Sequence, residues 1–377
     1  MRLSVNILYF LSAFFVSFVV CLFLVRFRHA HAHLTADNDL DGAQKFHAFA
    51  VPRVGGLALL LALLLDIPLV YLFDGASLGG AFALLLASAF PAFAGGMAED
   101  ILKIGLIKTR LFAMVVSCLL LIALLGWLII RTDMAIVDWL VQYHWLAVIV
   151  TVAAILGIIN AFNLIDGYNG LSSAVGMIML ASLSYVAFKV GDRLVMVAAV
   201  SMIGACLGFT LWNWPRGLIF LGDGGAYTLG FWLAALAIAI VMRNPSVSPW
   251  YSSVLLLYPI VETIFTIQRR LDRKAHPGMP DAAHLHQLIY KRMMRWAVGS
   301  SCPEERTMRN SMTSPYLWFF ASLSVVPATL LWHSTLGLQI TAICFVIGYL
   351  WLYRCITRFK TPKWLVYRKT SRKSREV

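Results

Sequence analysis

The sequence predicts an all-α, polytopic membrane protein with about 11 transmembrane helices. Hydrophobic residues make up 60% of the 377 positions, charged residues make up 13%, and the mean hydropathy is +0.79. A soluble domain of this length cannot bury so much apolar side chain. The apolar residues also gather into runs of about 20, the length that crosses the hydrocarbon core of a bilayer. No run shows the alternating pattern of an outer-membrane barrel strand.

Eleven segments have the length and composition of membrane spans. In chain order they are residues 3–25, 54–73, 79–98, 111–130, 145–161, 171–189, 194–211, 225–242, 250–268, 316–333 and 335–355. The first resembles a signal peptide, but Arg26 and Arg28 follow it directly. This flank favours a helix that stays in the membrane.

The positive charges predict the orientation of these spans. With the N-terminus in the periplasm, 26 of the 31 Lys and Arg residues lie on the cytoplasmic side and five on the other. The positive-inside rule favours that arrangement, and an odd number of spans then puts the C-terminus in the cytoplasm. The net charge of +13 is expected to face anionic membrane lipids, so nucleic acid is not an expected partner.

The chain contains no linker long enough to separate two domains. We expect one transmembrane domain over 1–357, with a cytoplasmic insertion at 269–315 and a basic cytoplasmic tail at 358–377. All the chemically unusual residues fall in the predicted cytoplasmic loops, so a functional site is expected on that face.

The second cytoplasmic loop contains adjacent acids, Glu99 and Asp100, with Lys103 close by. Two carboxylates at a helix end suit a divalent cation or a proton transfer. A solvated surface of acids and bases is the alternative.

The third loop follows a helix that carries Asn160, Asn163 and Asp166 at positions i, i+3 and i+6. Polar groups with this spacing in the last turns of a membrane helix are costly unless they face a polar cavity. Helix capping is the alternative. Asn169 follows in the same loop.

The fourth loop places Asp223 in the glycine cluster Gly222–Gly225, ten residues after Asn213. Glycines let backbone N–H groups approach an anion, while the carboxylate can hold the cation that neutralises it. This combination suits a diphosphate with Mg²⁺, and a flexible interhelical loop is the alternative.

Four further residues are candidates for binding phosphate. Lys45 and Arg53 lie in the first loop, where Arg53 follows a proline that begins the next helix. His284 and His286 lie in the long insertion. Their i, i+2 spacing without a nearby cysteine is poor zinc geometry, and a solvated pair on a loop is the alternative.

Glu262 is a carboxylate inside the ninth predicted span. Ionisable groups within the membrane are candidates for function. Because Arg269 and Arg270 follow about two turns later, we expect Glu262 to support the structure by pairing with one of them.

Taken together, five motifs resemble the polyprenyl-phosphate N-acetylhexosamine-1-phosphate transferases, the superfamily that contains peptidoglycan translocase I. In chain order they are Val51-Pro-Arg-Val-Gly-Gly56, Glu99-Asp100, Asn160-Ala-Phe-Asn-Leu-Ile-Asp-Gly167, Asn213 with Phe220-Leu-Gly-Asp-Gly-Gly225, and His284-Leu-His286. The resemblance covers roughly residues 45–290.

The resemblance implies transfer of a sugar 1-phosphate from a UDP-N-acetylhexosamine to undecaprenyl phosphate, with release of UMP. It implies Mg²⁺ as cofactor, with Mn²⁺ as an alternative. It also implies the bacterial inner membrane, a site facing the cytoplasm, a lipid-linked cell-surface polysaccharide as destination and a homodimer as one oligomeric state. Neither the sugar nor the polysaccharide pathway follows from the motifs.

The resemblance also assigns roles to individual residues. Asp223, with Asp166, corresponds to the metal-binding acids, and Asp100 with Glu99 to the acidic pair that activates the lipid phosphate. Asp166 is also expected to be a catalytic residue, together with this pair. The substrate-binding positions are Asn160, Asn163, Asn213, Arg53, Lys45, Lys103, His284 and His286. The chain departs from the pattern at Glu99, where most relatives have Asp, and at Asn169, where many have a second Asp.

Other functions remain open from sequence alone. An inactive protein that binds lipid-linked sugars fits the two departures. A membrane transporter is the non-enzyme alternative, and it is disfavoured because the acids cluster at helix ends and no internal repeat is apparent. A CDP-alcohol phosphotransferase is disfavoured because its closely spaced aspartates are missing after Asp166.

Overall fold

The computed structural model describes residues 2–29, 51–102, 107–272, 284–294 and 303–358, which fold as helices joined by short connections. The helices are α1 (Arg2–Arg26), α3 (Gly56–Asp74), α4 (Ala76–Leu102), α5 (Ile107–Leu125), α6 (Ala135–Val141), α7 (His144–Ile165), α8 (Leu171–Val190), α9 (Arg193–Asn213), α10 (Gly222–Arg243), α11 (Pro249–Leu255), α12 (Leu257–Asp272), α13 (Leu285–Leu288), the π-helix η1 (Ile289–Met294), α15 (Pro303–Leu330) and α16 (Thr335–Thr357). Lys45, Lys103 and the tail beyond residue 358 lie outside the described residues.

The prediction of an all-helical chain with many apolar helices is confirmed. Within the described residues, nine helices are long and apolar enough to cross a membrane, and the bent pair α11 and α12 makes up to ten. The predicted span 316–333 coincides with α15, which is not among these ten. A helix therefore lies at each of the eleven predicted positions, while the count of eleven and the orientation stay predictions.

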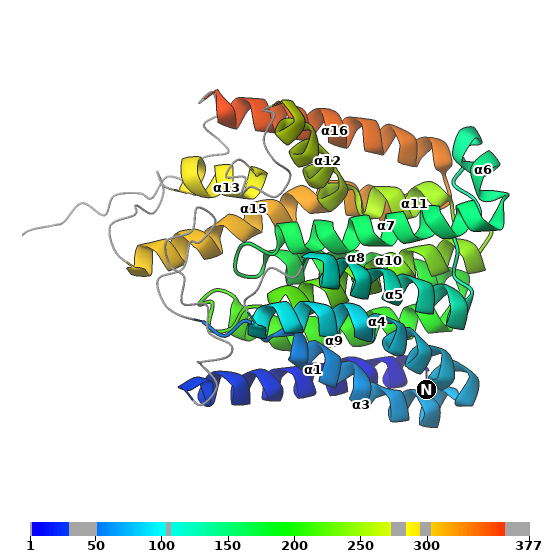
Figure 1. Ribbon diagram of the computed structural model, residues 1–377, viewed down its shortest axis with the longest axis horizontal. Helices are drawn as coiled ribbons and strands as arrows, with labels where there is room; N and C mark the ends of the chain where they lie inside the picture. The colour runs from blue at the N-terminus through cyan, green and yellow to red at the C-terminus, as the bar shows by residue number, and fades with distance from the viewer. Residues whose placement is uncertain (1, 30–50, 103–106, 273–283, 295–302, 359–377) are drawn as a thin grey trace, which may run out of the picture.

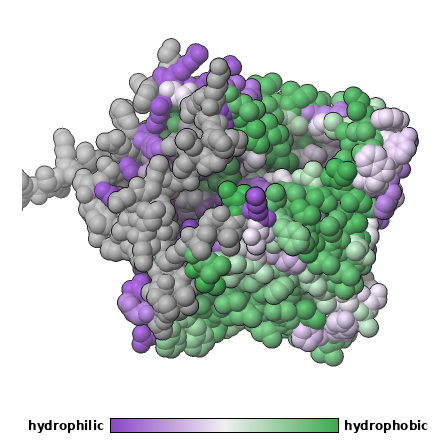
Figure 2. Space-filling model, viewed as in Figure 1, coloured by the Kyte–Doolittle hydropathy of each residue, from purple (hydrophilic) through white to green (hydrophobic). Residues whose placement is uncertain are grey.

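The helices run side by side, so that the chain begins at one end of the bundle and α16 finishes at the other (Figure 1). Apolar side chains cover most of the middle of the visible face, and hydrophilic residues gather towards its ends (Figure 2). Large apolar side chains are exposed on the bundle, among them Leu72, which is 74% exposed, and Phe112, which is 70% exposed. Such a surface matches the hydrocarbon interior of a bilayer.

The ninth predicted span is broken. The sequence predicts one helix over 250–268, but α11 and α12 meet at Leu256 with a bend of 68°. Pro259, in the first turn of α12, lacks the N–H group that would continue the hydrogen bonding of α11. The break directs α12 towards the insertion, whose described part contains α13 and the start of α15.

At the centre of the bundle lies α10, which is buried along almost its whole length. Its first turn packs directly against two helices because glycines face each other. A Cβ atom on Gly56 of α3 would lie 2.4 Å from the nitrogen of Gly225, and one on Gly96 of α4 would lie 2.5 Å from that of Gly224. Small residues at such crossings let helices in a membrane approach closely. The ends of α3, α4 and α10 therefore meet at Asp223.

Candidate active site

The first loop is joined to the start of α10 by backbone hydrogen bonds. The N–H groups of Gly55 and Gly56 donate to the carbonyl oxygens of Phe220 and Leu221, at 2.9 and 2.8 Å. This pairing places Arg53 beside the first turn of α10.

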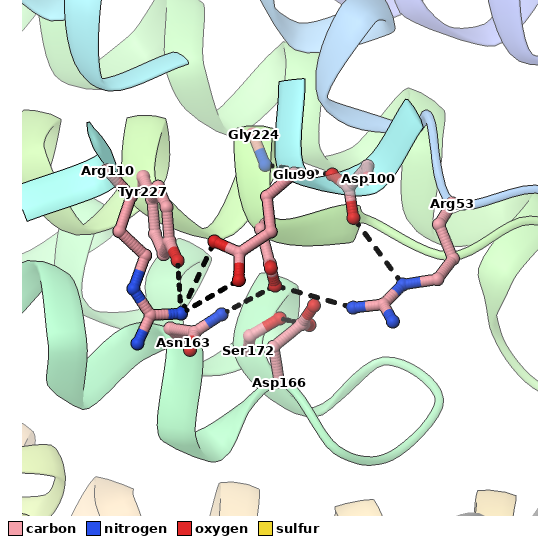
Figure 3. A network of polar contacts seen from close by, with 10 residues as sticks. Arg53, Glu99, Asp100, Arg110, Asn163, Asp166, Ser172, Gly224 and Tyr227 are labelled. Carbon is pink, nitrogen blue, oxygen red and sulfur yellow. Dashed lines mark hydrogen bonds and ion pairs between the residues drawn. The ribbon is translucent and has the colours of Figure 1, made fainter. Parts of the chain in front are cut away.

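The Arg53 guanidinium lies between two of the predicted acids (Figure 3). Its Nε is 3.5 Å from Oδ1 of Asp100, and its Nη2 is 3.3 Å from Oδ1 of Asp223. Asp100 is only 7% exposed, and its Oδ2 accepts the backbone N–H of Gly224 at 3.1 Å. One cation thus bridges carboxylates that are far apart in sequence.

The third predicted acid approaches the same guanidinium from α7. Asn163 Nδ2 donates to Asp223 Oδ1 at 2.8 Å, and Asp166, the residue that ends α7, accepts a hydrogen bond from Ser172. Burial raises the pKa of Asp166 to about 7, and the charges of Asp223 and Asp100 act in the same direction, whereas Arg53 opposes them. The three carboxylates therefore share one electrostatic environment.

Gly222 makes this arrangement sterically feasible. Its φ angle is +75°, in the region that favours glycine. A Cβ atom there would lie 2.4 Å from the carbonyl oxygen of Arg53 and 2.6 Å from Asp100 Oδ2. The glycine before Asp223 therefore lets two chain segments and a carboxylate converge.

Glu99 forms a separate ion pair at the edge of this group. Its two carboxylate oxygens lie 3.1 and 3.3 Å from Nη1 of Arg110, which is also 3.5 Å from the hydroxyl of Tyr227. The adjacent acids thus have different cations: Asp100 meets Arg53, and Glu99 meets Arg110 of α5.

Asn160 and Asn213 have surroundings that differ from those of Asn163. Asn160 is exposed and donates to Leu156 within its own helix, at 2.7 Å. Asn213 is 5% exposed; it accepts the N–H of Gly170 at 2.5 Å and donates to the carbonyl of Ile219 at 2.8 Å. Asn213 therefore joins two loops.

Asn169 belongs to a network that sequence reasoning missed. Its backbone N–H donates to Asn310 Oδ1 at 2.8 Å and its carbonyl oxygen accepts from Ser314 at 2.6 Å. Its side-chain Nδ2 lies 3.3 Å from both the Pro215 carbonyl oxygen and Ser311 Oγ. The side chain thus acts as a donor between α15 and the fourth loop, a role that an aspartate cannot fill. Nothing in the sequence pattern linked position 169 to α15.

The two histidines are buried. His284 is 3% exposed and His286 is 2% exposed, so the alternative of a solvated pair is wrong. The rings stack with their centroids 5.2 Å apart, and His286 contacts the Tyr168 ring at 5.3 Å. Burial, helped by the neighbouring His284, lowers the pKa of His286 to about 3. The part of the insertion that carries these histidines therefore packs against the loop after Asp166.

Glu262 bonds to groups other than the arginines expected from sequence. Its Oε1 lies 3.3 Å from His284 Nδ1 and accepts the N–H of Leu285 at 3.1 Å, while Oε2 accepts the hydroxyl of Tyr349 at 2.8 Å. The sequence feature that pointed to Glu262 was a carboxylate inside an apolar segment. The sequence could not indicate which distant segments would meet it.

The donor set around Arg53 fits a divalent cation that substrate phosphates help to hold. In the described residues, no three His, Cys, Asp or Glu side chains form a ready metal cage. Mg²⁺ is commonly held by one or two carboxylates together with phosphates and water, so such a cage is not required. Buried Oδ1 of Asp100 has no hydrogen-bond partner besides the 3.5 Å ion-pair contact, and it faces the same cation as Asp223. Asp223, with the carboxylates of Asp166 and Asp100 beside it, is thus suited to hold a cation together with substrate phosphates.

Comparison with known proteins supports the resemblance drawn from the motifs. Residues 82–241 match the model of glycosyl transferase family 4. The chain is 27% identical over 281 residues to a probable undecaprenyl-phosphate N-acetylglucosaminyl 1-phosphate transferase of Bacillus subtilis, covering 74% of this chain and 76% of that protein. It is 25% identical to an undecaprenyl-phosphate alpha-N-acetylglucosaminyl 1-phosphate transferase of Thermotoga maritima, covering 74% and 81%.

A more distant branch matches a shorter stretch. The chain is 40% identical over 86 residues to a phospho-N-acetylmuramoyl-pentapeptide-transferase of Streptococcus thermophilus, covering 23% of this chain and 25% of that protein. The match to the family model includes Asp100, Asn163, Asp166, Asn213 and Asp223. The resemblance inferred from the motifs is thereby confirmed: the chain is similar to glycosyl transferase family 4 and to polyprenyl-phosphate sugar 1-phosphate transferases within it.

Proposed function

We propose that the protein transfers an N-acetylhexosamine 1-phosphate from a UDP-sugar to undecaprenyl phosphate and releases UMP. The names of the relatives from Bacillus subtilis and Thermotoga maritima support this reaction class and favour N-acetylglucosamine as the sugar. The product would initiate a lipid-linked cell-surface polysaccharide.

The convergence of Asp100, Asp166 and Asp223 around Arg53 carries the proposal. These residues come from four segments that are distant in sequence. Two anionic phosphates have to meet during the transfer, so the site needs positive charge together with groups that can hold a cation. A guanidinium beside three carboxylates at the helix ends supplies both.

The proposed reaction exchanges one phosphoryl bond for another. A phosphate oxygen of the lipid attacks the β-phosphorus of the UDP-sugar and forms a new P–O bond. The bond between that phosphorus and the oxygen bridging to the α-phosphate breaks, and UMP leaves with the electron pair. Asp100 positions the lipid phosphate or removes its last proton.

The other residues would hold and orient the reacting groups. Asp223 and Asp166 would hold Mg²⁺, or Mn²⁺ as the alternative, and this ion supplies charge neutralisation at the diphosphate. Asn163 orients the Asp223 carboxylate through its 2.8 Å hydrogen bond. Arg53 is suited to bind a phosphate oxygen once a metal ion occupies the carboxylates.

The distribution of Lys and Arg supports a cytoplasmic active site and the inner membrane as location. Eleven spans with the N-terminus in the periplasm would bring the first, second, third and fourth loops to one side. The described ends of α4, α7 and α10 meet there. A homodimer remains a proposal with no further support.

The proposal is tested with protein purified in detergent, undecaprenyl phosphate and Mg²⁺. UMP release is measured with UDP-GlcNAc, UDP-GalNAc, UDP-QuiNAc and UDP-FucNAc, and the lipid product is identified by mass spectrometry. We expect one UDP-sugar to give equal amounts of UMP and lipid-linked sugar phosphate, and EDTA to abolish both. A preparation that binds the lipid but forms neither product would contradict the proposal and favour the inactive binding protein.

A further inference from the structure

Glu262 of α12 is a fully buried carboxylate that accepts hydrogen bonds on both of its oxygens. The backbone N–H of Leu285 and the hydroxyl of Tyr349 donate to it at 3.1 and 2.8 Å, and His284 Nδ1 is 3.3 Å away. An ionised carboxylate has only acceptors, so it matches three donors arranged in this way. The Glu262 carboxylate therefore stabilises the segment around His284 as long as its three hydrogen-bond donors keep their positions.

The same contacts select one tautomer of His284. Because a carboxylate can only accept, the contact favours a His284 ring with a proton on Nδ1. Thr266, one turn after Glu262 on α12, also contacts Nδ1, at 3.0 Å. Two side chains from one face of α12 therefore fix both the ring plane and the protonation pattern of this histidine.

The His284 ring connects α12 to the three-acid site. It stacks on His286 with an angle of 13° between the ring planes. His286 Nε2 lies 3.7 Å from the position that a Cβ on Gly167 would take, directly after Asp166. A continuous series of contacts thus runs from Glu262 through both histidines to the turn that carries Asp166.

The bend between α11 and α12 makes this series of contacts feasible. Because of this bend, α12 contacts α16, and the rings of Phe265 and Tyr353 pack edge to face with their centroids 4.6 Å apart. Tyr349, which donates to Glu262, lies one turn earlier on α16. Glu262 is therefore held on one side by α16 and contacts the histidine segment on the other.

We propose that Glu262 is a positioning residue that sets His284 and His286 against the Asp166–Gly167 turn. Its effect on catalysis rests on the function proposed above, whereas its effect on the order of residues 284–288 does not. Because Glu262 acts through His284, replacing it should have little effect once His284 has been removed.

A double-mutant cycle tests the catalytic part of the proposal. We expect Glu262→Gln to lower kcat/KM for UDP-GlcNAc at least about tenfold, as for other groups that orient a functional histidine. In the His284→Ala background the same change should alter kcat/KM by less than about twofold. Equal losses in both backgrounds would overturn the proposal.

A matched pair of threonines on α12 supplies the control. Thr266→Val removes the contact to His284 and a weak 3.4 Å contact from Arg269, whereas Thr263→Val removes, within the described residues, a hydrogen bond to Pro259 in the same helix. We expect Thr266→Val to lower kcat/KM and Thr263→Val to leave it unchanged, with both variants within about 2 °C of the wild-type Tm. Equal activity of the two variants would contradict the proposal.

Hydrogen–deuterium exchange tests whether Glu262 orders residues 284–288, without any activity measurement. Amides 285–288 should exchange faster in Glu262→Ala than in the wild type, and Thr263→Val should leave them unchanged. Unchanged exchange in Glu262→Ala would overturn the proposal. If wild-type protein releases no UMP from any donor, the proposed function fails, and the exchange measurement still decides whether Glu262 holds the histidine segment.

Discussion

Asn213 and Asn160 were both predicted to bind substrate, but their contacts in the structure predict opposite responses to mutation. Asn213 is buried and joins the loops at Gly170 and Ile219, whereas Asn160 is exposed and bonds only within its helix. We therefore expect Asn213→Ala to destabilise the protein and Asn160→Ala to be nearly neutral.

The magnitude follows from the two groups that Asn213→Ala leaves without a partner. These are the N–H of Gly170 and the carbonyl of Ile219, both bonded to Asn213 at below 3 Å. Each buried group left unsatisfied costs about 1–3 kcal/mol, so the total loss is about 2–6 kcal/mol. For a chain of 377 residues, with an unfolding entropy of about 0.8 kcal/mol/K, this corresponds to a fall in Tm of about 3–8 °C. Asn160→Ala should change the free energy of unfolding by less than about 0.5 kcal/mol.

The assay is thermal unfolding in detergent, followed by intrinsic fluorescence, beside the KM for UDP-GlcNAc. The two alanine variants are compared with the wild type in the same micelles, and unfolding is scanned at one heating rate. The reasoning is refuted if Asn213→Ala unfolds at the wild-type temperature while its KM rises. That outcome would mean that Asn213 contacts the substrate and that the two loops do not need it.

Two further substitutions test the packing of the site. Gly222→Ala places a methyl group 2.6 Å from Asp100 Oδ2 at a φ angle of +75°, so we expect loss of UMP release and a lower Tm; wild-type activity would contradict the described convergence. Asn169→Asp replaces a donor to the Pro215 carbonyl with a carboxylate, which should cost about 2–4 kcal/mol. Thermal unfolding measures that loss, and a variant as stable as the wild type would show that Asn169 is not a necessary donor.

The sequence was a good guide wherever function required a residue type in a fixed local pattern. The apolar runs predicted helical structure at every span, although the ninth is broken in two, and the motifs indicated the resemblance that the comparisons support. The convergence of Asp100, Asp166 and Asp223 followed from the expectation that their loops lie on one side. The helical spans, the motifs and the side on which each loop lies depend on local composition and on the number of membrane crossings, and both can be read from a single sequence.

What the sequence could not supply were the contacts between distant segments. Asn160 and Asn163 share one predicted helix face, six and three residues before Asp166, but of the two only Asn163 reaches the first turn of α10, because the rotation of the helix is set by packing. Glu262 meets His284 across a bend that Pro259 makes feasible but does not specify. Such pairings depend on how the helices pack together.

The central claim is that the three-acid site carries out phosphoryl transfer to the lipid, and an isotope experiment tests it directly. UDP-GlcNAc labelled with ³³P in its β-phosphate is incubated with undecaprenyl phosphate and wild-type, Asp223→Asn or Asp272→Asn protein. Asp272 is an exposed acid at the end of α12 and serves as the matched control.

We expect wild type and Asp272→Asn to move the label into the lipid fraction and to release unlabelled UMP. Asp223→Asn should lower the rate about 100-fold or more while its Tm stays close to that of the wild type. Label released as UDP, or equal rates for Asp223→Asn and Asp272→Asn, would contradict the account.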